Sequence, residues 1–125
     1  MLFRSNREVS SLLIAAEKQI QEYLTGTRKN FDLPKNPIGS EFQLRVWQEI
    51  DQIRYGKTAS YGELAFKLSS SPRPVGSACG KNPIPIIIPC HRVIAKSGQM
   101  AGYSGGGGLE TKRLLLSLET KSYPA

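Results

Sequence analysis

The chain has 125 residues, of which 39% are hydrophobic and 22% charged, and its formal net charge is +7. This length and composition indicate a globular protein with a single modest core, and no segment approaches the roughly 18 consecutive apolar residues of a membrane span. Residues 1–7 lack the apolar stretch of a secretory signal. We therefore expect a cytoplasmic protein, associated with the nucleoid if its source is prokaryotic.

The chain contains two cysteines and one histidine. In a reducing compartment, two cysteines are expected to be free thiols rather than a disulfide. Their spacing with the histidine does not match a structural zinc site, so we expect neither a metal nor another cofactor.

Positive charge is concentrated between residues 52 and 109, where only Glu63 opposes the basic residues. A basic stretch of this kind is a weak indication of a polyanionic partner such as DNA, RNA or an acidic membrane. The basic residues are Arg54, Lys57, Lys67, Arg73, Lys81, Arg92 and Lys96.

The N-terminal third predicts one helix and a linker. Ser5 and Glu8 have the spacing of a capping box, apolar residues then recur with helical period, and Gly26 is a plausible stop. Residues 27–39 contain two prolines and are interpreted as a linker. The expected organisation is therefore residues 1–39 as helix and linker and residues 40–125 as the main domain.

Three short helices are predicted next. The first begins at Ser40 and the second at Ser60, each with a Gln or Glu three residues later as in a capping box. The third begins at Ser71, has Pro72 at its favoured first position and ends near Gly80. The last two, joined by a tight serine-rich turn, have the outline of a helix-turn-helix.

The predicted helix of residues 71–80 is unusual because it contains Gly76, Ser77 and Ala78, which are small residues. Such residues allow another surface to approach the backbone closely. This suits a narrow nucleic-acid groove, but close packing between two helices is an alternative interpretation.

The apolar residues 84–88, bounded by prolines, predict a short strand that leads to Cys90 and His91. A last helix is expected over about residues 110–118, with Leu114, Leu115 and Leu118 facing inward and Glu119 at its end. A thiol in apolar surroundings stays inert unless a neighbour takes its proton, and histidine is the side chain that titrates near neutrality. From these residues alone, Cys90 is either a nucleophile or a small buried hydrophobe.

The motifs together resemble the DNA O6-alkylguanine alkyltransferases, also called methylated-DNA–protein-cysteine methyltransferases. The resemblance runs from about residue 42 to residue 119. It is carried by Pro-Cys-His-Arg-Val at residues 89–93, by Tyr61 in Ser-Tyr-Gly-Glu, by Arg73 in Arg-Pro-Val-Gly, by Asn82 in Asn-Pro, by Tyr103 and Ser104 in Tyr-Ser-Gly-Gly, and by Glu119.

The resemblance implies an α+β, mostly helical fold. It is a winged helix-turn-helix-like alkyltransferase domain with a short strand leading to the active cysteine. The family usually has an N-terminal domain of strands and a helix, so residues 1–39 are interpreted as its remnant and the N-terminal region as truncated. The run Gly105 to Gly108 departs from the family by two additional residues beside the substrate pocket.

The resemblance also implies a mechanism. Cys90 would accept an alkyl group from O6-alkylguanine, and also from O4-alkylthymine, in a single turnover. His91 would take the thiol proton through a water molecule, with Glu119 orienting the imidazole, while Tyr61 and Ser104 would stabilise the departing guanine.

Further residues would bind the DNA. Arg73 would fill the space left by the flipped nucleotide, and Asn82 would act as a hinge. The backbone carbonyls of Cys90 and Val93 would hold the base, and Tyr103 would form a pocket wall. The helix that contains Gly76 and Ser77 would lie in the minor groove of duplex DNA, bound by a monomer.

Three other classes of protein are alternatives. A non-enzymatic alkyltransferase-like protein would bind alkylated DNA and recruit other repair pathways, but such proteins generally replace the acceptor cysteine. A helix-turn-helix transcription factor would leave unexplained the presence of Cys90, His91, Tyr103, Ser104 and Glu119. A cysteine hydrolase is disfavoured because nothing in this sequence marks an oxyanion hole.

Overall fold

The computed structural model describes residues 6–95 and 108–120. The chain divides into two compact units, Met1–Asn36 and Pro37–Ala125. In the part of the chain that is described, no helix is both long and apolar enough to cross a membrane. The interpretation of residues 1–39 as the remnant of a longer domain stays a prediction.

The first unit consists of helix α1 (Asn6–Leu24) and the segment that follows it. Gly26 terminates the helix with a left-handed φ of 85°, as expected, whereas the predicted cap Ser5 lies outside the described residues. The following segment is tied back to the helix, because the Gln19 side chain exchanges two hydrogen bonds, of 2.8 and 3.1 Å, with the backbone of Asp32. It is therefore attached along its first part rather than a free linker.

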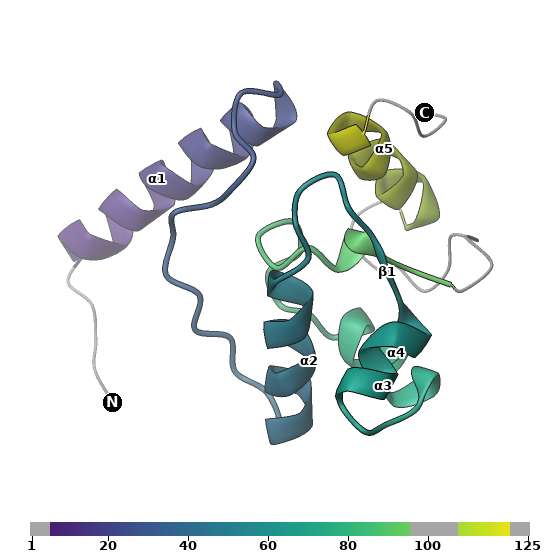
Figure 1. Cartoon of the computed structure of the whole chain (residues 1–125). Helices are drawn as coiled ribbons and strands as arrows, with labels where there is room; N and C mark the ends of the chain where they lie inside the picture. The colour runs from purple at the N-terminus through teal and green to yellow at the C-terminus, as the bar shows by residue number, and fades with distance from the viewer. Residues whose placement is uncertain (1–5, 96–107, 121–125) are drawn as a thin grey trace. The chain divides into compact units, whose positions relative to one another are not determined.

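In the second unit, helices α2 (Glu41–Asp51), α3 (Tyr61–Lys67) and α4 (Pro72–Gly80) enclose the core (Figure 1). The capping boxes predicted at Ser40 and Ser60 are both present, since each serine side chain accepts from the backbone three residues later and the Gln or Glu side chain bonds back. Trp47 is 2% exposed and its Nε1 donates to the carbonyl of Ala78 at 2.9 Å. This bond joins α2 to α4.

Helices α3 and α4 pack against each other as the predicted helix-turn-helix pair. Ser69 takes a left-handed φ of 54° in the turn between them. Helix α4 begins with Pro72, and Ser71 precedes it in an extended conformation without a side-chain cap bond. The fixed φ of proline favours helix initiation at this position.

The predicted strand over residues 84–88 is wrong. These residues form a turn in which Ile86 has a φ of 76°, and the Asn82 Oδ1 accepts from the backbone N–H of Ile84 at 3.0 Å. Pro83 and Pro85 also lack the N–H groups that a strand uses. The strand adjacent to the cysteine in the chain therefore follows it instead of leading to it.

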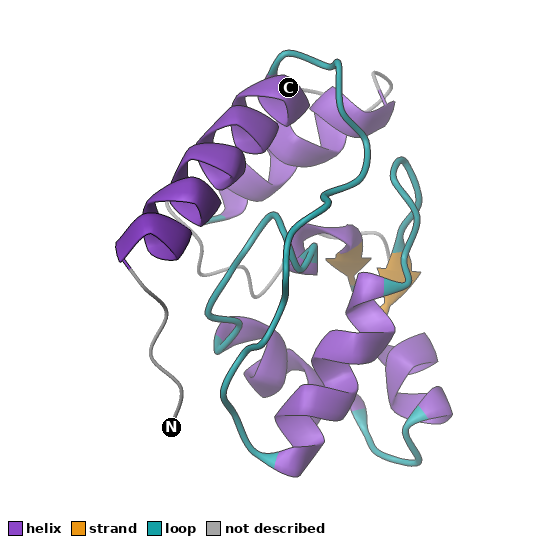
Figure 2. Ribbon diagram, turned by 90° about the vertical axis from the view of Figure 1, so that its left-hand side faces the viewer, coloured by secondary structure: helices purple, strands orange, loops and turns teal. Residues whose placement is uncertain are grey.

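That strand is β2 (Val93–Ile94), which pairs in parallel with β1 (Ala59–Ser60). Figure 2 shows the two strands side by side. A single-turn helix, η1 (Cys90–Arg92), immediately precedes β2. Because α3 starts directly after β1, this pairing brings Tyr61 close to the Cys90 segment.

Helix α5 (Leu109–Thr120) packs against η1. The prediction that Leu114 faces inward is wrong, since this residue is 50% exposed. The buried face consists of Lys112, Leu115, Leu116 and Glu119. Spacings of three and four residues place these positions on one side of a helix, and this side includes two charged residues.

Candidate active site

The Cys90 thiol lies at the start of η1, in the core cluster of the second unit, and the residue is 4% exposed. Asn82 holds the turn before it: its Nδ2 donates to the carbonyl of Ile88 at 2.8 Å and to Cys90 Sγ at 3.0 Å. A single amide group therefore fixes the turn and at the same time donates to the sulfur. The predicted hinge role of Asn82 stays a prediction.

Cys79, on α4, is the second polar neighbour of this sulfur. A hydrogen bond from the Cys79 thiol lowers the pKa of Cys90, and the Asn82 bond and the charge of Lys112 lower it further, against the opposing effect of burial. The same bond, together with burial, raises the pKa of Cys79. The thiolate form of Cys90, which is the nucleophilic form of cysteine, is therefore favoured, with Cys79 as the hydrogen-bond donor.

His91 is completely buried beside Glu119, with 2.7 Å between His91 Nε2 and Glu119 Oε2. An ionised carboxylate only accepts hydrogen bonds, so we assign the ring proton to Nε2. Nδ1 is then the nitrogen with a lone pair available to receive a proton. Glu119 therefore selects the tautomer of His91 that can act as a base.

Arg92 completes the arrangement around Glu119. Its Nε donates to Oε1 at 2.8 Å and its Nη2 to Oε2 at 2.9 Å, a bidentate pair. The backbone N–H of Gly56 also donates to Oε1, at 3.2 Å. The Glu119 carboxylate is consequently held from three directions inside the protein.

The pKa of His91 is lowered from its ordinary value of 6.5, mainly by burial, although the hydrogen bond with Glu119 acts in the opposite direction. The charges of Arg92 and Lys112 lower it further. The imidazole is therefore neutral at neutral pH, which is the state required of a proton acceptor.

Tyr61 occupies the first position of α3 and is half-buried against the core cluster. Burial, with the nearby Cys79 and Cys90, raises the pKa of Tyr61 to about 12. Its hydroxyl is thus protonated under ordinary conditions and can donate. A Cβ placed on Gly76 would lie 3.9 Å from the Tyr61 ring, so α4 passes close to this side chain.

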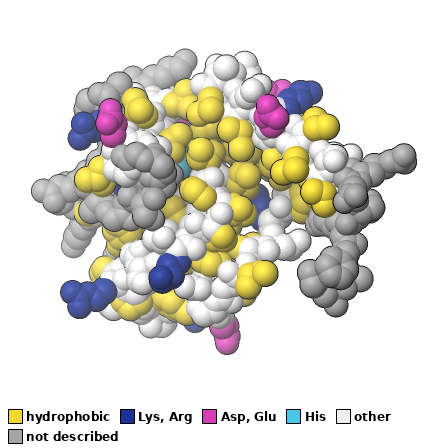
Figure 3. All heavy atoms as spheres, turned by 180° about the vertical axis from the view of Figure 1, so that it is seen from behind, with side chains coloured by type: hydrophobic (Ala, Val, Ile, Leu, Met, Phe, Trp, Pro, Cys, Tyr) yellow, Lys and Arg dark blue, Asp and Glu magenta, His cyan; other side chains and the backbone are white. Residues whose placement is uncertain are grey.

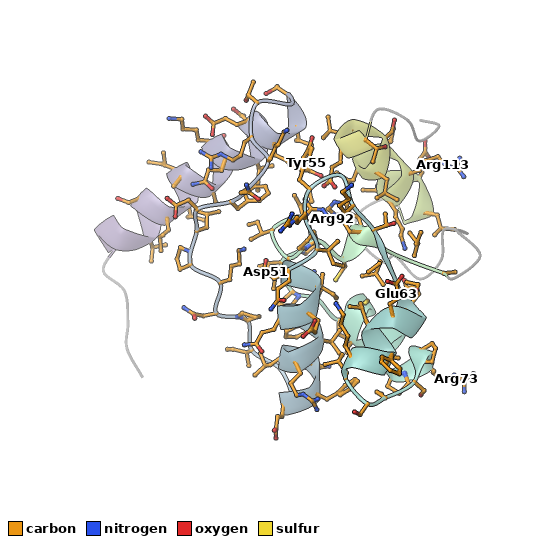
Figure 4. All side chains as sticks on the ribbon, in the orientation of Figure 1. Asp51, Tyr55, Glu63, Arg73, Arg92 and Arg113 are labelled. Carbon is orange, nitrogen blue, oxygen red and sulfur yellow. The ribbon has the colours of Figure 1, made fainter. Side chains whose placement is uncertain are left out.

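Helix α4 has two different faces. Val75, Ala78 and Cys79 are buried, whereas Arg73 and Ser77 are exposed and Gly76 is partly exposed. Figure 4 shows Arg73 directed outward, away from α3. The structure therefore places Cys90, His91, Glu119, Asn82 and Tyr61 around one buried centre, and Arg73 at the surface.

On the face seen in Figure 3, lysine and arginine side chains are scattered rather than gathered into one continuous patch. Val93 is fully buried in β2. Tyr103, Ser104 and residues 105–107, which include the proposed substrate loop, lie outside the described residues.

Comparison with known proteins decides the family. Residues 41–121 match the model of the 6-O-methylguanine DNA methyltransferase, DNA binding domain. The chain belongs to this family. It is 47% identical over 112 residues to the methylated-DNA–protein-cysteine methyltransferase of Mycolicibacterium paratuberculosis, covering 88% of the chain and 67% of that relative.

Other members of the methyltransferase family agree. The inducible Bacillus subtilis enzyme is 46% identical over 106 residues, covering 83% of the chain and 58% of that protein, so the chain spans about three-fifths of its length. The crystal structure of Mycobacterium tuberculosis OGT in complex with DNA has a TM-score of 0.81 at 46% identity, covering 89% of this chain and 69% of that one.

A more distant member is the Schizosaccharomyces pombe protein Atl1, whose structure is a complex with damaged DNA containing O6-carboxymethylguanine. It has a TM-score of 0.57 at 28% identity and covers 66% of this chain and 79% of that one. The methyltransferase fold predicted from the sequence is confirmed by these structures.

Sequence reasoning missed three polar residues of the centre. Arg92 lies inside the motif that identified Cys90, and its burial was not anticipated. Lys112 is a charged residue on the buried face of α5. Its burial could be inferred only once it was known which side of that helix faces inward. The part played by Cys79 has no signal in the sequence, because a sequence does not show that two cysteines 11 positions apart will meet.

Proposed function

We propose that this protein repairs DNA by a single, stoichiometric transfer of an alkyl group from O6-alkylguanine to Cys90 Sγ, with O4-alkylthymine as a second substrate. The observation that carries the proposal is the hydrogen bond of 3.0 Å from Asn82 Nδ2 to Cys90 Sγ, which together with Cys79 lowers the pKa of Cys90, in the same buried centre as a neutral histidine. Family membership and relatives named as methyltransferases support it.

In the proposed reaction His91 Nδ1 takes the thiol proton through a water molecule, and Glu119 stabilises the imidazolium. The thiolate attacks the alkyl carbon, so an S–C bond forms as the C–O6 bond breaks and the electron pair leaves with the guanine. Tyr61 donates its proton to the guanine ring, and Ser104 donates to the oxygen. Tyr61 then regains a proton from solvent, and His91 releases its own.

The product is a thioether, which is a poor leaving group. Nothing in the proposed mechanism regenerates the thiol, so each molecule acts once. This conclusion distinguishes the reaction from that of a cysteine hydrolase, whose acyl-enzyme is hydrolysed in every cycle.

The alkylated nucleotide reaches the site by leaving the duplex, which costs a few kcal/mol. Arg73 enters the vacated space, while Gly76 and Ser77 let α4 lie against the minor groove. The backbone carbonyls of Cys90 and Val93 hold the flipped base and Tyr103 forms a wall of its pocket. The protein acts as a monomer in the cytoplasm, on the nucleoid of a prokaryotic cell.

The test is transfer of label from a duplex with one radiolabelled O6-methylguanine to the protein. We expect at most one label per molecule, located by peptide mass spectrometry on Cys90 and not on Cys79, and no transfer to Cys90→Ala. Label on Cys79, or repeated turnover, would contradict the proposal.

The second candidate is a non-enzymatic alkyltransferase-like protein. The similarity to Atl1, whose structure is a complex with damaged DNA, supports this candidate. It would bind the lesion tightly without taking up label. Equal binding to undamaged duplex without transfer would favour a transcription factor instead. The cysteine at position 90, with its lowered pKa, favours the enzyme over both.

A further inference from the structure

The connection between α2 and β1 reaches the polar centre, although the proposed reaction assigns it no role. The backbone N–H of Lys57 donates to the carbonyl of Arg54 at 2.9 Å, so Tyr55 and Gly56 are the two central residues of a four-residue turn. Gly56 has a φ of 79°, a value that favours glycine at the third position of a β-turn. The backbone of the turn therefore fixes where Tyr55 lies.

This turn holds Arg92. The Nη1 of Arg92 donates to the carbonyl of Ile53 at 2.6 Å, and the guanidinium carbon lies 5.7 Å from the centroid of the Tyr55 ring, a cation–π distance. Figure 4 shows Tyr55 and Arg92 as neighbours. Because Nε and Nη2 bind Glu119, the orientation of the guanidinium depends on the turn as well as on the acid.

The same turn also contacts the end of α5. The backbone N–H of Gly56 donates to Glu119 Oε1 at 3.2 Å, and the Tyr55 hydroxyl lies 3.5 Å from the carbonyl of Leu118, at the outer limit of a hydrogen bond. A Cβ placed on Gly56 would lie 3.6 Å from the backbone oxygen of Glu119. The turn therefore touches both members of the buried ion pair.

The contacts continue from the ion pair to the proposed base. Glu119 Oε2 accepts from Arg92 Nη2 at 2.9 Å and lies 2.7 Å from His91 Nε2. The side chains of His91 and Glu119 are both 0% exposed, so solvent does not compete for this oxygen. A displacement of Arg92 would consequently move the carboxylate that orients the imidazole.

We propose that Tyr55 is a positioning residue for alkyl transfer: its ring holds the Arg92 guanidinium against Glu119 and thereby fixes the hydrogen bond that orients His91. The inference rests on the proposed function, because it takes His91 as the base. A cation–π contact is worth a factor of about 2 to 30 in an equilibrium. An aliphatic side chain at position 55 would fill part of the space without attracting the cation.

The test uses the fact that His91 is the only histidine of the chain. Histidine labelled with 15N therefore gives one imidazole signal in the full chain. A short hydrogen bond moves the resonance of the Nε2 proton downfield, and the exchange of this proton with water reports how well the bond is kept. The rate of reaction with free O6-benzylguanine is measured in parallel, because this small substrate removes the contribution of DNA binding.

The variants are Tyr55→Leu, Tyr55→Phe and Arg54→Leu, and urea denaturation checks that each is folded. We expect Tyr55→Leu to move the Nε2 proton upfield, to speed its exchange with water and to slow the reaction by about two- to thirty-fold. Tyr55→Phe keeps the ring and should retain most of the wild-type behaviour. Arg54 is exposed in the same turn, so Arg54→Leu is the matched control and should equal the wild type.

A folded Tyr55→Leu variant with the wild-type resonance and exchange would overturn the inference. A shifted resonance with an unchanged rate would overturn it as well, because the orientation of His91 would then not matter for transfer. An equal loss in Tyr55→Phe would overturn the part assigned to the ring. If Tyr55→Leu does not fold, Tyr55→Met carries the same expectations.

The proposed function can fail separately. If the wild type takes up no alkyl group from O6-benzylguanine or from alkylated duplex, while Tyr55→Leu still shifts the Nε2 proton, the assignment of Cys90 as acceptor is overturned. The role of Tyr55 in orienting His91 would then stand. The resonance and the rate therefore distinguish the two failures.

Discussion

The guanidinium of Arg92 donates two parallel hydrogen bonds, of 2.8 and 2.9 Å, to the carboxylate of Glu119 in the interior of the second unit. The same oxygen that accepts the second of these bonds also accepts from His91 Nε2. The pair thus neutralises a buried arginine and orients the proposed base. A structural ion pair and a catalytic hydrogen bond share one carboxylate.

Glu119→Gln should destabilise the protein strongly, because it leaves the Arg92 charge buried without its counter-ion. Breaking a buried ion pair from one side costs about 3–5 kcal/mol. Urea denaturation measures the loss, with Glu110→Gln as control because Glu110 is exposed in the first turn of the same helix. A loss below about 1 kcal/mol, the ordinary value of an exposed pair, would contradict the structural role of this pair.

Stability should fall as the pH is lowered through about 6.5, because burial holds the pKa of His91 below that ordinary value. In this window the unfolded chain binds the proton and the folded chain does not, so protonation favours unfolding and stability rises with pH. The slope is measured by denaturation at several pH values. His91→Gln should flatten it, and an unchanged slope would remove His91 as its source.

Tyr61→Phe should slow transfer by about two to three powers of ten, since it removes a hydrogen-bond donor to the leaving group. The free energy of unfolding should change little. Tyr55→Phe is the comparison variant, because it removes a hydroxyl that donates to the carbonyl of Leu118 at 3.5 Å. Equal rates for Tyr61→Phe and the wild type would exclude Tyr61 as the proton donor.

Asn82→Asp should impair transfer more than Asn82→Ala does. Both lose the amide donor to Cys90 Sγ and the bond to Ile88, and a buried acceptor left unsatisfied costs about 1–3 kcal/mol. The aspartate also places a negative charge beside the thiolate, which disfavours it. Single-turnover rates at neutral pH give the order, and the reverse order would show that Asn82 acts on the turn alone.

Arg73→Ala should slow repair of duplex DNA far more than reaction with free O6-benzylguanine, because only the duplex reaction needs a flipped nucleotide. Lys67→Ala, which removes another exposed cation from the helix-turn-helix pair, controls for general attraction to phosphates. Equal losses in the two Arg73→Ala assays, or an equal loss in Lys67→Ala, would remove Arg73 from the flipping role.

The sequence predicted the parts of the fold that short-range chemistry decides. The helix starts at Ser40 and Ser60 were correct because a capping box is complete within four residues. The strand expected over residues 84–88 was wrong because the Asn82 side chain bonds to the backbone of Ile84 and draws an apolar run into a turn.

The polar centre was predicted only in part, because it depends on contacts between residues that are far apart in the sequence. The phase of α5 was misjudged at Leu114 because hydrophobicity suggested that leucines, rather than Lys112, would face inward. A lysine takes such a position when distant groups compensate its charge. Its contact with Tyr61, 51 positions earlier, depends on the folded arrangement rather than on any local pattern.

The bond from Arg92 to Glu119 also bears on synthesis at the ribosome. The arginine emerges 27 residues before the acid that neutralises it, so a nascent chain that has reached β2 still holds an unmatched guanidinium. The ring nitrogen facing the acid is likewise not yet fixed at that stage. The arginine charge is therefore matched, and the His91 ring fixed, only after the last turn of α5 has been made.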